Sequence, residues 1–246
     1  MGLLKRLFKK TAKRKRHMFC SAVVAAAGSS RRMGGENKIF SEIRGVPVIA
    51  RTLEALESCE LIDEIVITAR SEDITEIANV CQEYGITKAT KIIIGGATRT
   101  ESVYNGVLET SPNAELIAVH DAARPFATAE LIEKVIRKAA ETNAAAPAVP
   151  VKDTIKSVVD GKIVNTLDRS VLYAFQTPQV FSGDILKGAL QNALDKKLDL
   201  TDDCAAVEAL GVAVYVTEGS YDNIKITTPS DLTAAESIVD SMEGRI

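Results

Sequence analysis

Short apolar runs alternate with helical periodicity along most of the chain from Phe19 onward. Runs rich in Val, Ile and Ala predict buried strands, and apolar residues spaced three and four apart predict amphipathic helices. The expected strands of the first part are Cys20–Ala27, Glu64–Ala69, Lys91–Ile94, Leu116–His120 and Ala145–Val149. The expected helices between them are Pro47–Ser58, Asp73–Tyr84, Thr100–Glu109 and Ala129–Glu141. This order predicts an α/β fold with a doubly wound, mostly parallel, Rossmann-like sheet and a ligand site at the carboxyl ends of its strands.

The rhythm changes after Pro150. The stretch VKDTIKSVVDGKIVNTLDRSVLYAFQTPQ alternates apolar and polar residues around an Asp160–Gly161 turn, which is typical of a β-hairpin. We therefore expect a protruding β-arm at about residues 151–175, of the kind that packs against a second subunit. The α/β pattern then resumes, with helices expected at Ser182–Ala193, Asp203–Leu210 and from Pro229, and strands at Val212–Val216 and Ile224–Ile226.

Composition indicates one globular domain. The chain has 246 residues, of which 46% are hydrophobic and 26% charged, and we place a single domain at residues 18–246. None of the four cysteines forms a C-x-x-C pair, and only two histidines are present, which argues against a zinc site or a disulfide framework. Free thiols suit a reducing cytoplasm, and no apolar run is long enough to span a bilayer. We expect a soluble, cytoplasmic protein.

Charge is distributed unevenly. Residues 1–17 contain eight of the 30 basic residues and no acidic one, although the whole chain has a net charge of −3. This segment is expected to be a disordered basic extension; the alternative is a short helix on a membrane surface, with Leu3, Leu4, Leu7 and Phe8 on one face. The remainder is acidic, which argues against nucleic acid as a partner.

The first candidate for chemistry is the loop VVAAAGSSRRMGGENK, which follows the first expected strand. Ser30 and Met33 stand where a G-x-G-x-x-G motif needs glycine, and no G-K-[ST] occurs, so neither common phosphate-loop template is met. Gly28 nevertheless permits a close backbone approach, and Arg32 and Lys38 add positive charge suited to a triphosphate. The alternative is a basic surface loop.

Two further strand ends carry polar residues. In HDAARP, Asp121 is placed to hold Mg²⁺ together with substrate phosphates, with Arg124 close behind; the alternative is a carboxylate that caps the next helix. His120 is interpreted as a packed core residue. In GGATRTES, Gly95–Gly96 ends a strand, where a glycine-rich turn can present backbone groups to a base, and Ser102 lies in the first turn of the next helix; the alternative is ordinary turn chemistry.

Taken together, these segments resemble one enzyme family. AVVAAAGSSRRMGG…NK, GG…S, HDAARPF, PVKDTIK, LDRS, QTPQ, TDD and DNIKITTPSDL occur in order from about Phe19 to Ile238 and resemble the 2-C-methyl-D-erythritol 4-phosphate cytidylyltransferases of the non-mevalonate isoprenoid pathway. The resemblance implies that CTP and the sugar-alcohol phosphate give a CDP-alcohol and pyrophosphate. The acceptor's phosphate would attack the α-phosphorus in line, without a covalent enzyme intermediate.

The resemblance also implies residue roles. The catalytic residues would be Arg32, Lys38, Arg169 and Lys225, and Asp121 would hold Mg²⁺ or another divalent cation. The cytidine site would be formed by Ala26, Ala27, Gly28, Gly96, Ser102 and Ala122, next to Asp121. The acceptor would contact Arg124, Thr177, Thr201 and Lys225 of one subunit, and Thr154 and Arg169 of the other. A homodimer formed through the β-arm is therefore expected.

Two positions depart from the family pattern, and two other functions stay open. Ala25 replaces a common proline, and Ala97 replaces an acidic residue, which removes one polar contact near the base or ribose. A ribitol 5-phosphate cytidylyltransferase is the nearest alternative, although it commonly has Val where Ala123 stands. A nucleotide sensor without catalysis is the alternative of another class; the joint presence of the triphosphate and acceptor residues argues against it.

Overall fold

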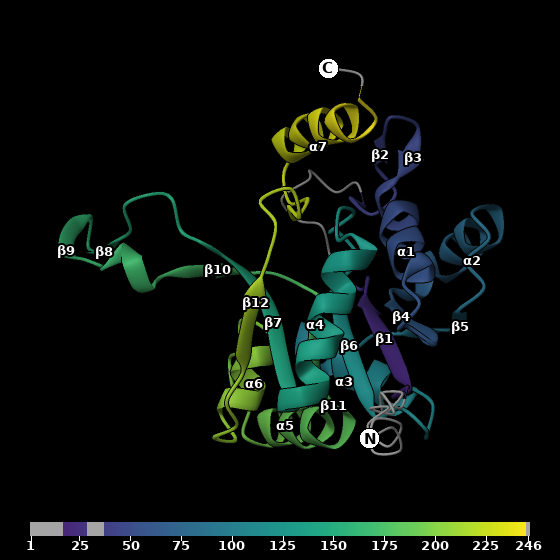
Figure 1. Cartoon of the computed structure of the whole chain (residues 1–246), viewed down its shortest axis with the longest axis horizontal. Coiled ribbons are helices and arrows are strands. Elements are labelled where there is room, and N and C mark those ends of the chain that lie inside the picture. Colours follow the sequence, from purple (N-terminus) through teal and green to yellow (C-terminus); the bar gives the residue numbers. More distant parts are fainter. Residues whose placement is uncertain (1–16, 29–36, 245–246) are drawn as a thin grey trace, which may run out of the picture.

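A mixed, mostly parallel sheet forms the centre of the molecule (Figure 1). The computed structural model describes residues 17–28 and 37–244. The strands of the sheet run in the order β10-β7-β11-β6-β1-β4-β5, with β12 also pairing with β7. Their bounds are β1 Cys20–Ala25, β4 Glu64–Ala69, β5 Ala89–Ile94, β6 Leu116–Asp121, β7 Ala144–Pro150, β10 Tyr173–Phe175, β11 Gln179–Ser182 and β12 Tyr215–Glu218. The expected α/β fold is confirmed.

Strand β1 forms the middle of the parallel part. Val23 is paired with Val66 of β4 on one side and with Val119 of β6 on the other, and all three are fully buried. Continuous apolar sequence is typical of such strands, because helices cover both faces of the sheet. The carboxyl ends of β1 and β6 therefore lie side by side, which places Ala25 opposite Asp121.

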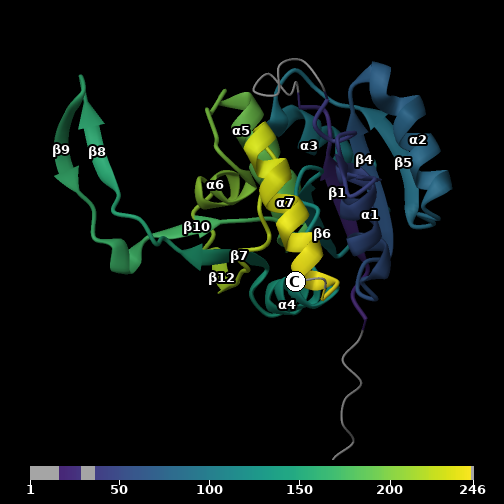
Figure 2. The same cartoon turned by 90° about the horizontal axis from the view of Figure 1, so that it is seen from above.

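Helices cover the sheet from both sides (Figure 2). Their bounds are α1 Val48–Ser58, α2 Ile74–Glu83, α3 Arg99–Leu108, α4 Ala129–Thr142, α5 Gly183–Asp195, α6 Asp203–Glu208 and α7 Pro229–Met242. Side chains of α1, α2 and α4 pack in one apolar cluster with one face, and those of α3, α5 and α6 pack in a second cluster with the other. Helix α7 packs on Ile43, Val48 and Phe126, beside the strand ends.

The β-arm is present where the alternating pattern predicts it. Strands β8 (Lys156–Val159) and β9 (Lys162–Thr166) form an antiparallel hairpin, and both turn residues have positive φ, 48° at Asp160 and 76° at Gly161. An Asp–Gly pair tolerates this conformation, which matches the twist of the flanking strands. The hairpin extends away from the body of the chain (Figures 1 and 2), and apolar Val158, Ile163 and Val164 are exposed on it.

Several short elements differ from the sequence-based expectations. Strand β11, inserted antiparallel between β6 and β7, was not expected, nor was the small hairpin of β2 (Glu42–Ile43) and β3 (Val46–Pro47). The strand expected at Val212–Val216 lies further along, as β12, because its pairing with β7 sets its limits. The strand expected at Ile224–Ile226 is irregular backbone, and its Ile226 amide donates to Ala123 O (2.8 Å). In residues 17–28 and 37–244, no helix has the length and apolar character needed to cross a membrane.

Candidate active site

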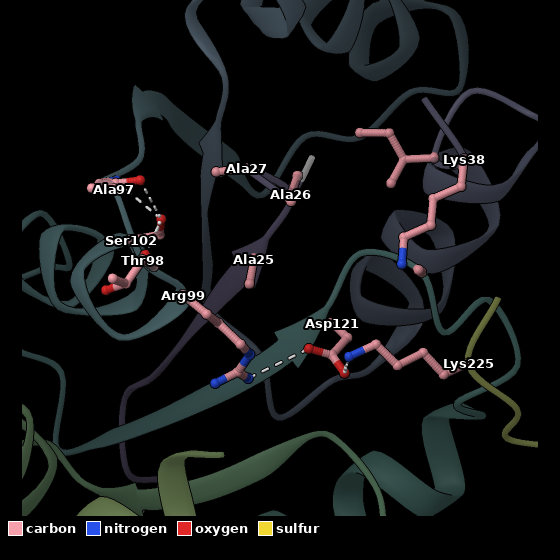
Figure 3. A pocket seen from close by; sticks show the side chains of 14 residues that line it. Ala25, Ala26, Ala27, Lys38, Ala97, Thr98, Arg99, Ser102, Asp121 and Lys225 are labelled. Carbon is pink, nitrogen blue, oxygen red and sulfur yellow. Dashed lines mark hydrogen bonds and ion pairs between the residues drawn. The ribbon is translucent and has the colours of Figure 1, made fainter. Parts of the chain in front are cut away.

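A cavity of about 340 Å³ opens at the carboxyl ends of β1 and β6. Its walls come from the end of β1, the start of α3, the end of β6 and the segment that precedes α7, and Lys38 and Lys225 approach it opposite Arg99 (Figure 3). The lining residues with candidate roles are Ala26, Ala27, Gly28, Lys38, Gly96, Ser102, Asp121 and Lys225. The structure therefore brings together residues that are far apart in the chain, at the sheet edge where doubly wound folds bind ligands.

Small residues form the floor of this cavity. The Ala26 amide donates to Thr68 O (2.8 Å) and the Ala122 amide donates to Ala25 O (3.2 Å), so the end of β1 is held on both sides. Methyl side chains and Gly28 leave the backbone accessible to a ligand. This is the arrangement that a planar base and a sugar need for close contact with backbone groups.

The start of α3 forms one wall. Thr98 caps the helix by accepting the Glu101 amide (3.1 Å), and the Ser102 hydroxyl donates to Thr98 O (2.8 Å) while it accepts the Gly96 amide (3.0 Å). A Cβ on Gly95 would lie 2.6 Å from the Ala27 methyl carbon, too close for any side chain. Ser102 therefore fixes the glycine turn that faces β1.

Asp121 is the electrostatic centre of the site. Its carboxylate lies 2.8 Å from the Lys225 amine, 3.4 Å from the Arg99 guanidinium and 3.6 Å from the Arg124 guanidinium. Burial alone would raise the pKa of Asp121, but Lys225, Arg99 and Arg124 hold that pKa well below its usual range. The carboxylate is therefore ionised at neutral pH.

Arg99 was missed by the sequence analysis. Its guanidinium bridges Asp121 and Asp203, lying 2.8 Å from the Asp203 carboxylate, whose side chain is 1% exposed. Burial raises the pKa of Asp203, and the Arg99 charge opposes that rise. The available signal was an arginine in the first turn of the helix after Gly95–Gly96; its carboxylate partners could not be inferred from spacing.

His120 is a core residue, as expected, and it organises Asp121 and Arg124. It is fully buried, and burial lowers its pKa to about 4, so the imidazole is neutral. Because the Arg124 carbonyl only accepts, His120 Nε2–H donates to it (3.2 Å) and Nδ1 accepts the Thr177 hydroxyl (2.9 Å). The Thr177 oxygen in turn accepts the Asp121 amide (3.1 Å).

A second, smaller cavity of about 130 Å³ adjoins the first, with Arg99, Asp121 and Lys225 lining both. Three more of its lining residues were expected to contact the acceptor: Arg124, Thr177 and Thr201. The Arg124 guanidinium is anchored by donation to Asn223 O (2.7 Å), and its Nε atom is buried without a hydrogen-bond partner. The Thr177 hydroxyl hydrogen, by contrast, is directed to His120 rather than into the cavity.

Of the other expected residues that the structure describes, Thr154 and Arg169 line neither cavity within one chain. Thr154 and Arg169 belong to the exposed arm region, and Arg169 donates to Lys152 O. Arg32 and residues 1–16 of the basic extension lie outside the described residues. Across residues 17–28 and 37–244, no three His, Cys, Asp or Glu side chains gather as a protein-only metal site.

Comparisons with known proteins agree with this geometry. The 2-C-methyl-D-erythritol 4-phosphate cytidylyltransferase family matches residues 20–241. The enzyme of that name from Halalkalibacterium halodurans is 43% identical over 226 residues, covering 92% of this chain and 99% of the relative. A relative of the same name from Pelotomaculum thermopropionicum is 43% identical over 229 residues, covering 92% and 96%.

Solved structures agree as well. The crystal structure of the 4-diphosphocytidyl-2C-methyl-D-erythritol synthase from Anaerococcus prevotii has a TM-score of 0.82 at 31% identity and covers 91% of this chain and 97% of its own. The Thermus thermophilus 2-C-methyl-D-erythritol 4-phosphate cytidylyltransferase has a TM-score of 0.72 at 29% identity, covering 88% and 97%. The chain therefore belongs to the 2-C-methyl-D-erythritol 4-phosphate cytidylyltransferase family.

Proposed function

We propose that the chain transfers CMP from CTP to 2-C-methyl-D-erythritol 4-phosphate in isoprenoid precursor biosynthesis. The observation that carries the proposal is the pair of adjoining cavities that share Arg99, Asp121 and Lys225. The larger cavity is lined by small residues and a glycine turn, which suits a nucleoside, and the smaller by Arg124 and Thr201, which suits a phosphate monoester.

The nucleoside is proposed to bind between β1 and the start of α3. Backbone groups of Ala26, Ala27, Gly28 and Gly96 would meet the base and ribose. Ser102 and Ala122 would support them, since Ser102 accepts the Gly96 amide and the Ala122 amide donates to Ala25 O. A site that hydrogen-bonds a base through fixed backbone groups rejects an analogue that leaves one of them unpaired. Such a site would select cytosine over uracil. Ala97, which replaces the acidic residue common in the family, would supply no carboxylate to the base or ribose.

A divalent cation fits the Asp121 carboxylate. Mg²⁺ is commonly bound by one or two carboxylates together with substrate phosphates, and Asp121 is an ionised carboxylate at a strand end facing the cavity. The ion, when bound, would neutralise phosphate charge. Asp121 would hold it, exchanging its contact with Lys225, while Arg99 stays paired with Asp203.

The chain's own residues would position the reacting groups. Arg124, Lys225 and Thr201 would hold the acceptor's phosphate, and Lys38 and Arg32 would neutralise the triphosphate. One oxygen of the acceptor's phosphate forms a bond to the α-phosphorus of CTP, and the bond from that phosphorus to the bridging oxygen breaks, releasing pyrophosphate. Such catalysis depends on alignment and charge stabilisation.

Two arms are proposed to complete two sites in a homodimer. Thr154 and Arg169 lie on an arm that projects from its own subunit, with exposed apolar residues such as Ile163 and Val164. Crossing to the neighbour would cover these residues and place the partner's Arg169 at the acceptor phosphate.

The proposed compartment is the cytoplasm. All four cysteines are free thiols, which suits a reducing environment.

The test is pyrophosphate release by the purified chain with CTP and Mg²⁺, offering 2-C-methyl-D-erythritol 4-phosphate and D-ribitol 5-phosphate in parallel. Release with the first acceptor only is expected. If pyrophosphate is released with ribitol phosphate only, the reaction type stands but the acceptor is ribitol 5-phosphate. CTP binding without release in either case would instead support a sensor.

A further inference from the structure

Lys38 lines the nucleotide cavity, and the residue before it is tied to a buried carboxylate. The Asn37 side-chain amide donates to Asp73 Oδ2 (2.8 Å), and Asp73 is 4% exposed. Asp73 itself is not among the residues that line the cavity. Asp73 is connected to the site through the Asn37 side chain, which directly precedes Lys38 in the chain.

Asp73 is itself held in the turn between β4 and α2. Arg70, which directly follows that strand, donates from Nε to Asp73 Oδ2 (2.6 Å) and from Nη2 to Oδ1 (2.8 Å). The Asp73 amide also donates to Arg70 O (3.0 Å). A bidentate arginine–carboxylate pair has a defined geometry, so Asp73 offers Asn37 a fixed acceptor. The Arg70 charge also offsets that of Asp73, which limits repulsion of a nearby triphosphate.

The backbone on the other side of Lys38 is fixed as well. The Phe40 amide donates to Asn37 O (2.9 Å), and the Ile49 amide at the start of α1 donates to Ile39 O (2.9 Å). Ile39 is 3% exposed and packs in the core. Lys38 is thus bracketed by Asn37, tethered to the turn between β4 and α2, and by Ile39, tethered to α1. A lysine side chain is long and flexible, so its reach depends on where its backbone is held.

We propose that Asp73 is a positioning residue that acts through Asn37 to hold Lys38 at the triphosphate. The proposal rests on the proposed function only in taking a nucleotide triphosphate as the ligand of the cavity. Asp73 contributes no group to the reaction. Its effect is to keep the Lys38 amine where charge must be neutralised.

The test is a double-mutant cycle. Asn37→Ala and Asp73→Ala should each lower kcat/KM for CTP about 10- to 100-fold, as small displacements of charged groups do. In a Lys38→Ala background, neither change should have a further effect, because the group that they position is gone. Asp240→Ala is the matched control: it removes another bidentate arginine–aspartate pair, with Arg44, which lines neither cavity, and should leave kcat/KM unchanged.

Other results would overturn the proposal. If Asn37→Ala and Asp73→Ala reduce kcat/KM by the same factor with and without Lys38, they act independently of it. If they lower Tm but leave kcat/KM intact well below Tm, their role is structural. Measuring the same cycle in the Kd of CTP by calorimetry separates this result from the proposed function. Coupling to Lys38 in CTP binding supports the positioning role even if no acceptor reacts, and additivity refutes it even if one does.

Discussion

The Lys225 amine lies 2.8 Å from a carboxylate oxygen of Asp121, joining the segment before α7 to the end of β6. Asp121 is almost buried, whereas the Lys225 side chain is 37% exposed and lines both cavities. Lys225 is therefore pre-positioned by Asp121 and still accessible to an anion. In the proposed reaction, this pairing would place a cation where a phosphate oxygen of the acceptor approaches the α-phosphorus of CTP.

Replacing Lys225 by methionine should impair use of the acceptor more than binding of CTP. We expect kcat/KM for the sugar-alcohol phosphate to fall about 100-fold or more, because a charge-assisted contact to phosphate is lost. Initial rates of pyrophosphate release over a range of acceptor concentrations measure this change. Lys134→Met is the control, since Lys134 pairs with the exposed Glu218 away from both cavities. If Lys225→Met and Lys134→Met change kcat/KM equally, Lys225 is not part of the acceptor site.

Asp121→Asn should abolish the response of the protein to divalent cations. The carboxylate is the proposed ligand, and its loss also leaves Lys225, Arg99 and Arg124 without their common counter-charge. We expect at least about 100-fold slower turnover and much weaker Mn²⁺ binding in the presence of CTP, followed by electron paramagnetic resonance. Glu218→Gln should bind Mn²⁺ as the wild type does. Unchanged Mn²⁺ binding in the Asp121 variant would place the metal elsewhere.

Arg99→Met should destabilise the fold as well as the site. It leaves the buried Asp203 carboxylate without its partner at 2.8 Å, and breaking one half of a buried pair costs about 3–5 kcal/mol. Adding Asp203→Asn removes the uncompensated charge, so the double variant should recover part of the lost free energy of unfolding. Urea denaturation measures both. If the double variant is no more stable than Arg99→Met, the unpaired Asp203 charge is not the main cause of the lost free energy of unfolding.

Stability should fall as pH drops from 6.5 to about 4 because of His120. Burial lowers the pKa of His120 from 6.5 to about 4, against the opposing effect of Asp121, so only the unfolded chain takes up this proton in that window. The full contribution, about 3 kcal/mol, is present above pH 6.5 and is lost toward pH 4. His120→Gln, which cannot titrate but keeps a donor and an acceptor, should flatten this dependence. Urea titrations at pH 7.5 and 5 give the free energy of unfolding of the wild type and of His120→Gln. If this free energy changes equally with pH in both proteins, His120 is not the group responsible.

The arm should hold two chains together. Ile163→Asp with Val164→Asp places charge on exposed apolar positions of β9 and is expected to give a monomer with little activity, since each site would lose the partner's Arg169. Light scattering coupled to size-exclusion chromatography gives the mass of each form. A monomeric wild type, or an active monomeric variant, would contradict the arm's role.

The parallel core and the arm could be predicted from the sequence because their signals are local. The runs Glu64–Ala69 and Leu116–His120 are continuously apolar, and Asp160–Gly161 specifies a tight turn between alternating residues. Strand β11 has only four residues, and it is a strand because β6 and β7 lie on either side of it. No periodicity within those four residues carries that information.

Only part of the site could be predicted from the sequence, because local motifs can be recognised but contacts between distant segments cannot. Gly96, Ser102, Asp121 and Lys225 stand in motifs that resemble a known family, and the fold gathers all four around one cavity. Arg99 and Asp203 belong to different motifs, and their pairing depends on how α3 meets α6. Local sequence likewise gives no sign that the Thr177 hydroxyl is hydrogen-bonded to His120, because that contact joins β6 to the bend before β11.

Both substrates are proposed to meet beside Asp121 and to react without a covalent enzyme intermediate. The most direct test is the stereochemical course at the α-phosphorus, using one diastereomer of CTP with sulfur in place of an α-oxygen and 2-C-methyl-D-erythritol 4-phosphate. The configuration of the product is assigned by phosphorus nuclear magnetic resonance. A single in-line displacement predicts inversion at phosphorus. Retention would require two displacements and an enzyme-bound nucleotidyl group, and would contradict direct attack by the acceptor's phosphate.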